Sequence, residues 1–96
     1  MAGKIEGRVV AIAENGNLIT DIAAEQLQHA PSDQRVSISC DEHVTSGLFR
    51  SGHAEPEMTL LALLGDRGVL ELEIVGDSAS LMLGISVGEK VVVQWE

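Results

Sequence analysis

The sequence has 96 residues, a formal net charge of −9 and a single cysteine. This length predicts one domain, residues 1–96, and the core must be aliphatic because only one Phe and one Trp are present. Six basic residues against fifteen acidic ones argue against binding to nucleic acid or to an anionic membrane. Cys40 has no partner for an intramolecular disulfide, and no signal peptide or membrane-spanning run is visible, so we expect a cytoplasmic protein.

The first predicted element is a β-hairpin. Residues 4–13 are rich in Val and Ile and predict a strand. Asn15 and Gly16 both tolerate a positive φ, so this Asn-Gly pair predicts the turn. The segment 17–22 then predicts the return strand.

The middle of the chain predicts shorter elements. Residues 23–30 contain good helix formers and predict a short helix that ends at Pro31. Residues 35–40 alternate apolar and polar side chains, which is typical of a half-buried strand. Residues 41–49 predict a turn and a further strand, and the segment that follows, as far as Glu57, predicts a loop.

The last third begins with a continuous apolar strand at 58–64 and a turn at 65–68. Residues 69–75 predict another strand, which starts by alternating between apolar and acidic side chains. This alternation predicts that Glu71 and Glu73 point outward to solvent.

Residues 77–84 predict a single helical turn, with Ser78 near its start and Gly84 as the C-cap. Residues 91–95 predict the strand that closes the sheet. Together the segments predict an all-β domain, either a small antiparallel β-barrel or a sandwich of six or seven strands, with one or two short helices.

Three ordered motifs resemble a known family. They are GNLIT (16–20), LLALLGDRGVLELEI (60–74) and GDSASLMLGISVGEKV (76–91). They look like the C-terminal domain of the S-adenosylmethionine hydroxide adenosyltransferases, the family that includes the fluorinases and chlorinases. The resemblance implies a small β-barrel that, in the complete enzymes, packs against a larger N-terminal catalytic domain in a trimer. The chain resembles the second domain alone, so we expect no enzymatic activity from it by itself.

The resemblance also implies a ligand site. Gly16 and Asn17 match the family's Gly-Asn turn, whose Asn contacts adenine, and the backbone near Gly76 matches a second adenine contact. Asp66 and Arg67 match a Ser-Arg pair that holds the methionine carboxylate. Arg67 keeps its capacity for a bidentate bond, whereas an acidic neighbour repels a carboxylate and competes for the guanidinium.

Other positions depart from the family pattern. Ile12 and Ala13 occupy the place of the acidic anchor for the methionine amino group, and Asn15 replaces an aromatic residue. The adenine contacts are thus kept and the methionine contacts are weakened. This implies adenosine or another adenine compound as the ligand, rather than intact S-adenosylmethionine, with no cofactor.

Each motif also has a plainer interpretation. Turn chemistry alone accounts for the Gly-Asn pair, and a surface ion pair accounts for the Asp-Arg pair. Cys40, His43 and His53 do not supply the four convergent ligands of a structural zinc site, so we expect no metal.

One alternative function is a structural or interaction domain with a vestigial site, which forms a homo-oligomer or binds a protein partner through apolar segments such as 59–64 and 91–95. A second alternative is a subunit that completes an S-adenosylmethionine-cleaving enzyme in trans.

Overall fold

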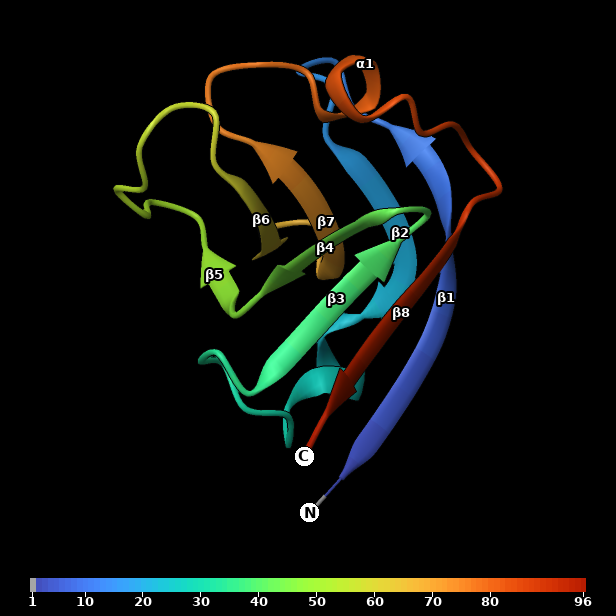
Figure 1. Ribbon diagram of the computed structural model, residues 1–96, viewed down its shortest axis with the longest axis vertical. Helices are drawn as coiled ribbons and strands as arrows, with labels where there is room; N and C mark the ends of the chain where they lie inside the picture. Colours follow the sequence, from blue (N-terminus) through green and yellow to red (C-terminus); the bar gives the residue numbers. More distant parts are fainter. Residues whose placement is uncertain (1) are drawn as a thin grey trace.

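The computed structural model describes residues 2–96 and shows one eight-stranded sheet that curls into a nearly closed barrel (Figure 1). The elements are β1 (Gly3–Ile12), β2 (Leu18–Ala23), the 3₁₀ helix η1 (Ala24–Leu27), β3 (Val36–Cys40), β4 (His43–Ser46), β5 (Leu48–Arg50), β6 (Leu60–Leu64), β7 (Val69–Ile74), α1 (Ala79–Leu83) and β8 (Lys90–Trp95). The strand order is β4-β3-β8-β1-β2-β7-β6-β5. The predicted all-β class is therefore confirmed.

The sheet contains more strands than the sequence predicts because the segment after Cys40 divides. Gly47 has a φ of 87° between β4 and β5, so the chain turns away from β4 at this point. β5 then pairs with β6 in parallel, with Leu48 opposite Ala62. Parallel neighbours need a crossover connection, and the segment 51–59 provides it (Figure 1).

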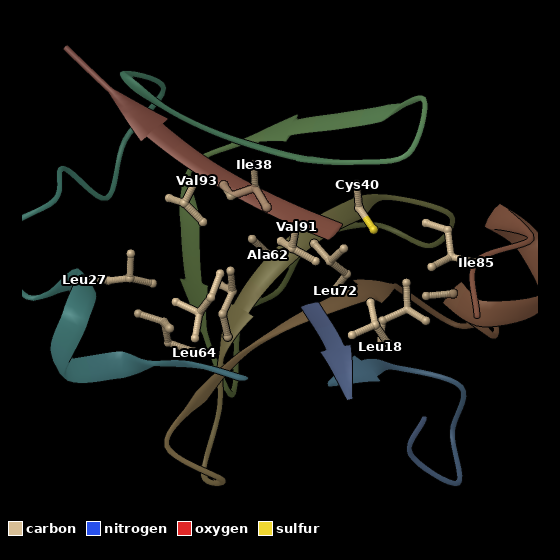
Figure 2. Packing of buried hydrophobic residues seen from close by; sticks show 14 of the residues in the cluster. Leu18, Leu27, Ile38, Cys40, Ala62, Leu64, Leu72, Ile85, Val91 and Val93 are labelled. Atoms are coloured by element: carbon tan, nitrogen blue, oxygen red, sulfur yellow. The ribbon is translucent and has the colours of Figure 1, made fainter. Parts of the chain in front are cut away.

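The interior of the barrel is aliphatic, as the composition predicts. Figure 2 shows side chains from several strands converging on it, with Leu27 of η1 at one end and Ile85, just after α1, at the other. The two short helical segments therefore close the opposite ends of the core. The buried cluster comprises Val9, Leu18, Ile22, Leu27, Val36, Ile38, Cys40, Ala62, Leu64, Leu70, Leu72, Ile74, Ala79, Ile85, Val91 and Val93.

Most apolar side chains of the segments considered for self-association are buried within the domain. In β6, Ala62 and Leu64 belong to the core cluster, and the alternating Leu61 and Leu63 are also buried. In β8, Val91 and Val93 are fully buried. Their apolar character is accounted for by folding, so it gives no support to an oligomer. Within residues 2–96 no helix has both the length and the apolar character needed to cross a bilayer.

The β1–β2 hairpin forms where the sequence predicts it, but with a different turn. The amide of Gly16 donates to the carbonyl of Ala13 at 2.8 Å, so Glu14 and Asn15 occupy the centre of the turn. Gly16 follows with a φ of 91°, whereas Asn15 does not have a positive φ. This is the three-residue loop in which a turn is followed by a glycine bulge, rather than a two-residue Asn-Gly turn.

The hairpin is attached to α1 through this glycine. Gly16 is buried, and its carbonyl accepts a hydrogen bond from the amide of Ser80 at 2.9 Å. A Cβ atom on Gly16 would overlap the hydroxyl of Ser78 and lie 2.6 Å from its Cα. Ser78 caps the helix by accepting from the amide of Leu81, and Gly84 ends it with a φ of 68°. The predicted helical turn and both of its caps are confirmed.

We predict that Gly16→Ala lowers the free energy of unfolding by about 2–4 kcal/mol, because it adds both backbone strain and a clash with Ser78. Gly52→Ala is the matched control, since Gly52 has a φ of 90° and no atom within 4 Å of the position that a Cβ atom would take. The control should lose only about 1 kcal/mol. Urea unfolding followed by the fluorescence of Trp95 measures both values, and equal losses would show that the contact with Ser78 is unimportant.

Candidate functional site

All but one of the residues proposed for the ligand site line two neighbouring depressions on the outer surface of the barrel. The larger has a volume of about 570 Å³, and Asn17 and Arg67 both line it. The smaller has a volume of about 340 Å³ and is lined by Asn17 and Gly76. Asn15, Asn17 and Glu73 border both depressions. The hairpin end and β7 thus bring Asp66, Arg67 and Gly76 around one asparagine.

Asn17 is held rigidly just before the start of β2. Its carbonyl accepts from the amide of Ala13 at 2.9 Å, and its amide donates to Oδ1 of Asn15 at 3.1 Å. Its side-chain Nδ2 donates to Oε1 of Glu71 at 3.2 Å. The residue is only 4% exposed.

The acceptor atom of the Asn17 side chain stays available to a ligand. Its Oδ1 makes no hydrogen bond within residues 2–96. No buried side-chain nitrogen or oxygen in that part of the chain lacks a partner, so Oδ1 must reach the open space of the depressions. The site therefore presents a hydrogen-bond acceptor at its centre.

Glu71 corrects the expectation drawn from strand alternation. The sequence predicts an outward, solvated carboxylate, but Glu71 is only 1% exposed. Alternation does place it on the opposite face from Leu70 and Leu72. That face is covered here, because the side chains of Arg67 and Asn17 lie against the Glu71 carboxylate. The carboxylate becomes the floor of the larger depression.

Arg67 pairs with Glu71 and not with its neighbour Asp66. Its Nη1 lies 3.2 Å from both carboxylate oxygens of Glu71. No hydrogen bond joins Asp66 to Arg67 within the described residues, so the partner of the guanidinium in this structure is Glu71. The Arg67 side chain is 54% exposed, and Asp66 lines the same depression.

His53 and Glu73, like Glu71, enter the site from positions that the sequence analysis did not select. Nε2 of His53 lies 3.1 Å from Oε1 of Glu73. Nδ1 of His53 accepts from the amide of Glu55, so Nε2 carries the hydrogen and donates it to the carboxylate. Both ring nitrogens are thus occupied. The pair holds the crossover segment against β7 rather than offering a general base.

Gly16 and Gly76 take different positions relative to the depressions. Gly76 has a φ of 80° and lines the smaller one, which leaves its backbone accessible. Gly16 lines neither, because it is buried against Ser78. Its role is therefore to fix the hairpin, and Asn17 and Gly76 are the predicted adenine contacts that face open space.

The charges around the site are mostly negative. Asp66, Glu71 and Glu73 line the larger depression, and Asp77 lines the smaller one. Among the described residues, Arg67 is the only Arg or Lys that lines either depression. Such a surface attracts cationic ligands, repels phosphates and leaves neutral ligands largely unaffected.

The cysteine is placed away from this surface. Cys40 is 2% exposed in the core, and burial, together with the negative charges of Glu89 and Asp41, raises the pKa of its thiol to about 11. It is therefore a poor nucleophile near neutral pH. Nε2 of His43 lies 3.1 Å from the carbonyl oxygen of Leu83. Within residues 2–96 no three His, Cys, Asp or Glu side chains are grouped to hold a metal ion.

Comparison with known proteins agrees with this fold. Residues 7–92 match the family model described as SAM hydroxide adenosyltransferase C-terminal domain. No curated protein matches the chain in sequence.

Two solved structures are similar to the domain. One is an uncharacterized conserved protein from Thermotoga maritima, with a TM-score of 0.76 and 19% identity. The other is a conserved hypothetical protein from Thermus thermophilus, with a TM-score of 0.73 and 26% identity. Each match covers 92% of this chain and 34% of the other, so the chain spans about a third of the length of these relatives.

We predict that Arg67→Ala lowers the free energy of unfolding by about 1–3 kcal/mol, because the buried carboxylate of Glu71 keeps only one partner. The double variant Arg67→Ala/Glu71→Gln should recover part of this loss, since a neutral amide needs no counter-charge. Arg50→Ala is the control, because Arg50 is exposed at the end of β5. Urea unfolding measures all three variants, and equal effects at Arg67 and Arg50 would contradict the role given to the ion pair.

Proposed function

The chain belongs to the SAM hydroxide adenosyltransferase C-terminal domain family, and from this premise we propose that it is a non-catalytic β-barrel module that binds an adenine-containing small molecule. The observation that carries the proposal is Asn17. Asn17 is only 4% exposed, it borders both depressions, and its Oδ1 has no hydrogen-bond partner among residues 2–96. This arrangement suits a ligand contact better than a turn alone.

The proposed contacts follow from hydrogen-bonding capacity. The exocyclic amine of adenine can donate a hydrogen bond to Oδ1 of Asn17. The base would then lie across the smaller depression, beside the accessible backbone of Gly76. Backbone groups suit this purpose because they keep their positions whatever side chains surround them.

The charges narrow the proposed ligand class. Four carboxylates near one guanidinium favour a neutral nucleoside or a sulfonium cation over a nucleotide that carries phosphates. Arg67 is already engaged with Glu71, and Asp66 is close to any carboxylate that would approach it. We therefore propose adenosine as a better ligand than intact S-adenosylmethionine.

We predict that adenosine raises the midpoint of thermal unfolding and that methionine does not. A ligand at about 100 times its dissociation constant adds about 2.7 kcal/mol of stability. In a domain of this size, this raises the midpoint by more than about 5 °C. S-Adenosylmethionine should produce a smaller shift, and adenosine monophosphate almost none at low salt.

Asn17→Ala tests the central contact, and it should abolish the shift with adenosine. Gln94→Ala is the matched control because Gln94 is an exposed amide in β8, away from the depressions. It should leave the shift unchanged. If adenosine produces no shift in the wild-type chain, the Gly-Asn motif is a turn only.

Exposed apolar side chains favour a second candidate function, an interaction module. Leu81 and Met82 of α1 are 83% and 49% exposed, and Val87 in the next loop is 57% exposed. Apolar side chains that stay exposed together in a folded domain are typical of protein-binding surfaces. The same surface could serve a subunit that completes an enzyme in trans, since the chain spans only 34% of the similar structures.

We predict for this second candidate that the chain self-associates, and that Leu81→Ser combined with Met82→Ser restores the monomer. Light scattering coupled to size-exclusion chromatography gives the mass of both proteins. A wild-type chain that stays monomeric at high concentration would remove self-association and leave a different protein as the only partner.

A further inference from the structure

We infer that Glu71 is a positioning residue that makes the site selective for purines with a 6-amino group over purines with a 6-oxo group. The inference rests on the proposed function, because it concerns the orientation of Asn17 toward the same ligand. It assigns a specificity role to a residue that the sequence alone would leave on the surface.

The side-chain amide of Asn17 can face Glu71 in only one orientation. An asparagine amide carries an acceptor and a donor group of similar size, so an unconstrained one can turn over and present either group. Here Nδ2 lies 3.2 Å from Oε1 of Glu71. A carboxylate only accepts hydrogen bonds. Turning the amide over would place two acceptors against each other, so Nδ2 must face Glu71.

Both Glu71 and the backbone of Asn17 are held in place. Glu71 cannot swing away from Asn17 easily, because it is 1% exposed and both of its oxygens also accept from Arg67 at 3.2 Å. The hairpin hydrogen bonds fix the backbone of Asn17. The acceptor Oδ1 of this side chain is therefore held in one position, where a ligand can meet it.

The fixed acceptor distinguishes purines by the group that they carry at C6. A 6-amino group donates to Oδ1, whereas a 6-oxo group directs its own lone pairs at the same atom. A purine with only hydrogen at C6 makes no bond there. A site that is built to receive a donor rejects analogues without one because the acceptor then stays unpaired. A glutamine at position 71 could donate or accept, so it would remove this constraint on Asn17.

Isothermal titration calorimetry of the full chain with adenosine, inosine and purine riboside tests the inference. For the wild type we expect adenosine to bind at least about tenfold more tightly than the other two nucleosides. For Glu71→Gln we expect the ratio of adenosine to inosine affinity to fall to about threefold or less, because the amide of Asn17 can then turn over. A merely structural role would lower all affinities together and leave the ratio unchanged.

The outcomes separate this inference from the function on which it rests. If the wild-type chain binds adenosine and inosine with equal affinity, the role of Glu71 is overturned and the adenine-binding proposal stays intact. An unchanged ratio in a folded Glu71→Gln variant would also overturn it. Binding of none of the nucleosides would overturn the proposed function and the inference together. If Glu71→Gln does not fold, equal affinities of the wild type for adenosine and inosine would still overturn the inference.

Discussion

The buried carboxylate of Glu71 is the constraint around which the surface of this domain is arranged. It lies on a central strand, 1% exposed, and it needs hydrogen-bond donors because an unpaired buried charge is costly. Asn17, just before β2, and Arg67, in the β6–β7 turn, supply them. One side chain therefore joins three segments and sets the orientation of the groups beside the two depressions.

The hairpin that carries Asn17 depends in turn on a contact that only glycine permits. Gly16 lies against Ser78 without room for a Cβ atom, and its carbonyl receives the amide of Ser80. The start of α1 and the end of the β1–β2 hairpin are thus fixed to each other. Since loops positioned by a rigid scaffold are where binding residues usually lie, this contact gives the site its stable geometry.

Much of the fold could be predicted because it depends on local chemistry. Alternation identified the buried face of β3, and the capping residues Ser78 and Gly84 identified α1. The division of residues 43–50 into two strands could not be predicted, because it depends on which distant strand each half pairs with. For the same reason, the parallel pairing of β5 with β6 has no local pattern.

The sequence by itself determined the all-β class and the aliphatic core, since composition and periodicity are properties of neighbouring residues, and the family resemblance of its motifs drew attention to Asn17 and Arg67. Only the tertiary structure decided that Glu71 is buried, that Arg67 pairs with it rather than with Asp66, and that His53 reaches Glu73. Alternation along a strand tells which face a side chain occupies. Whether that face meets water depends on what the rest of the chain lays over it.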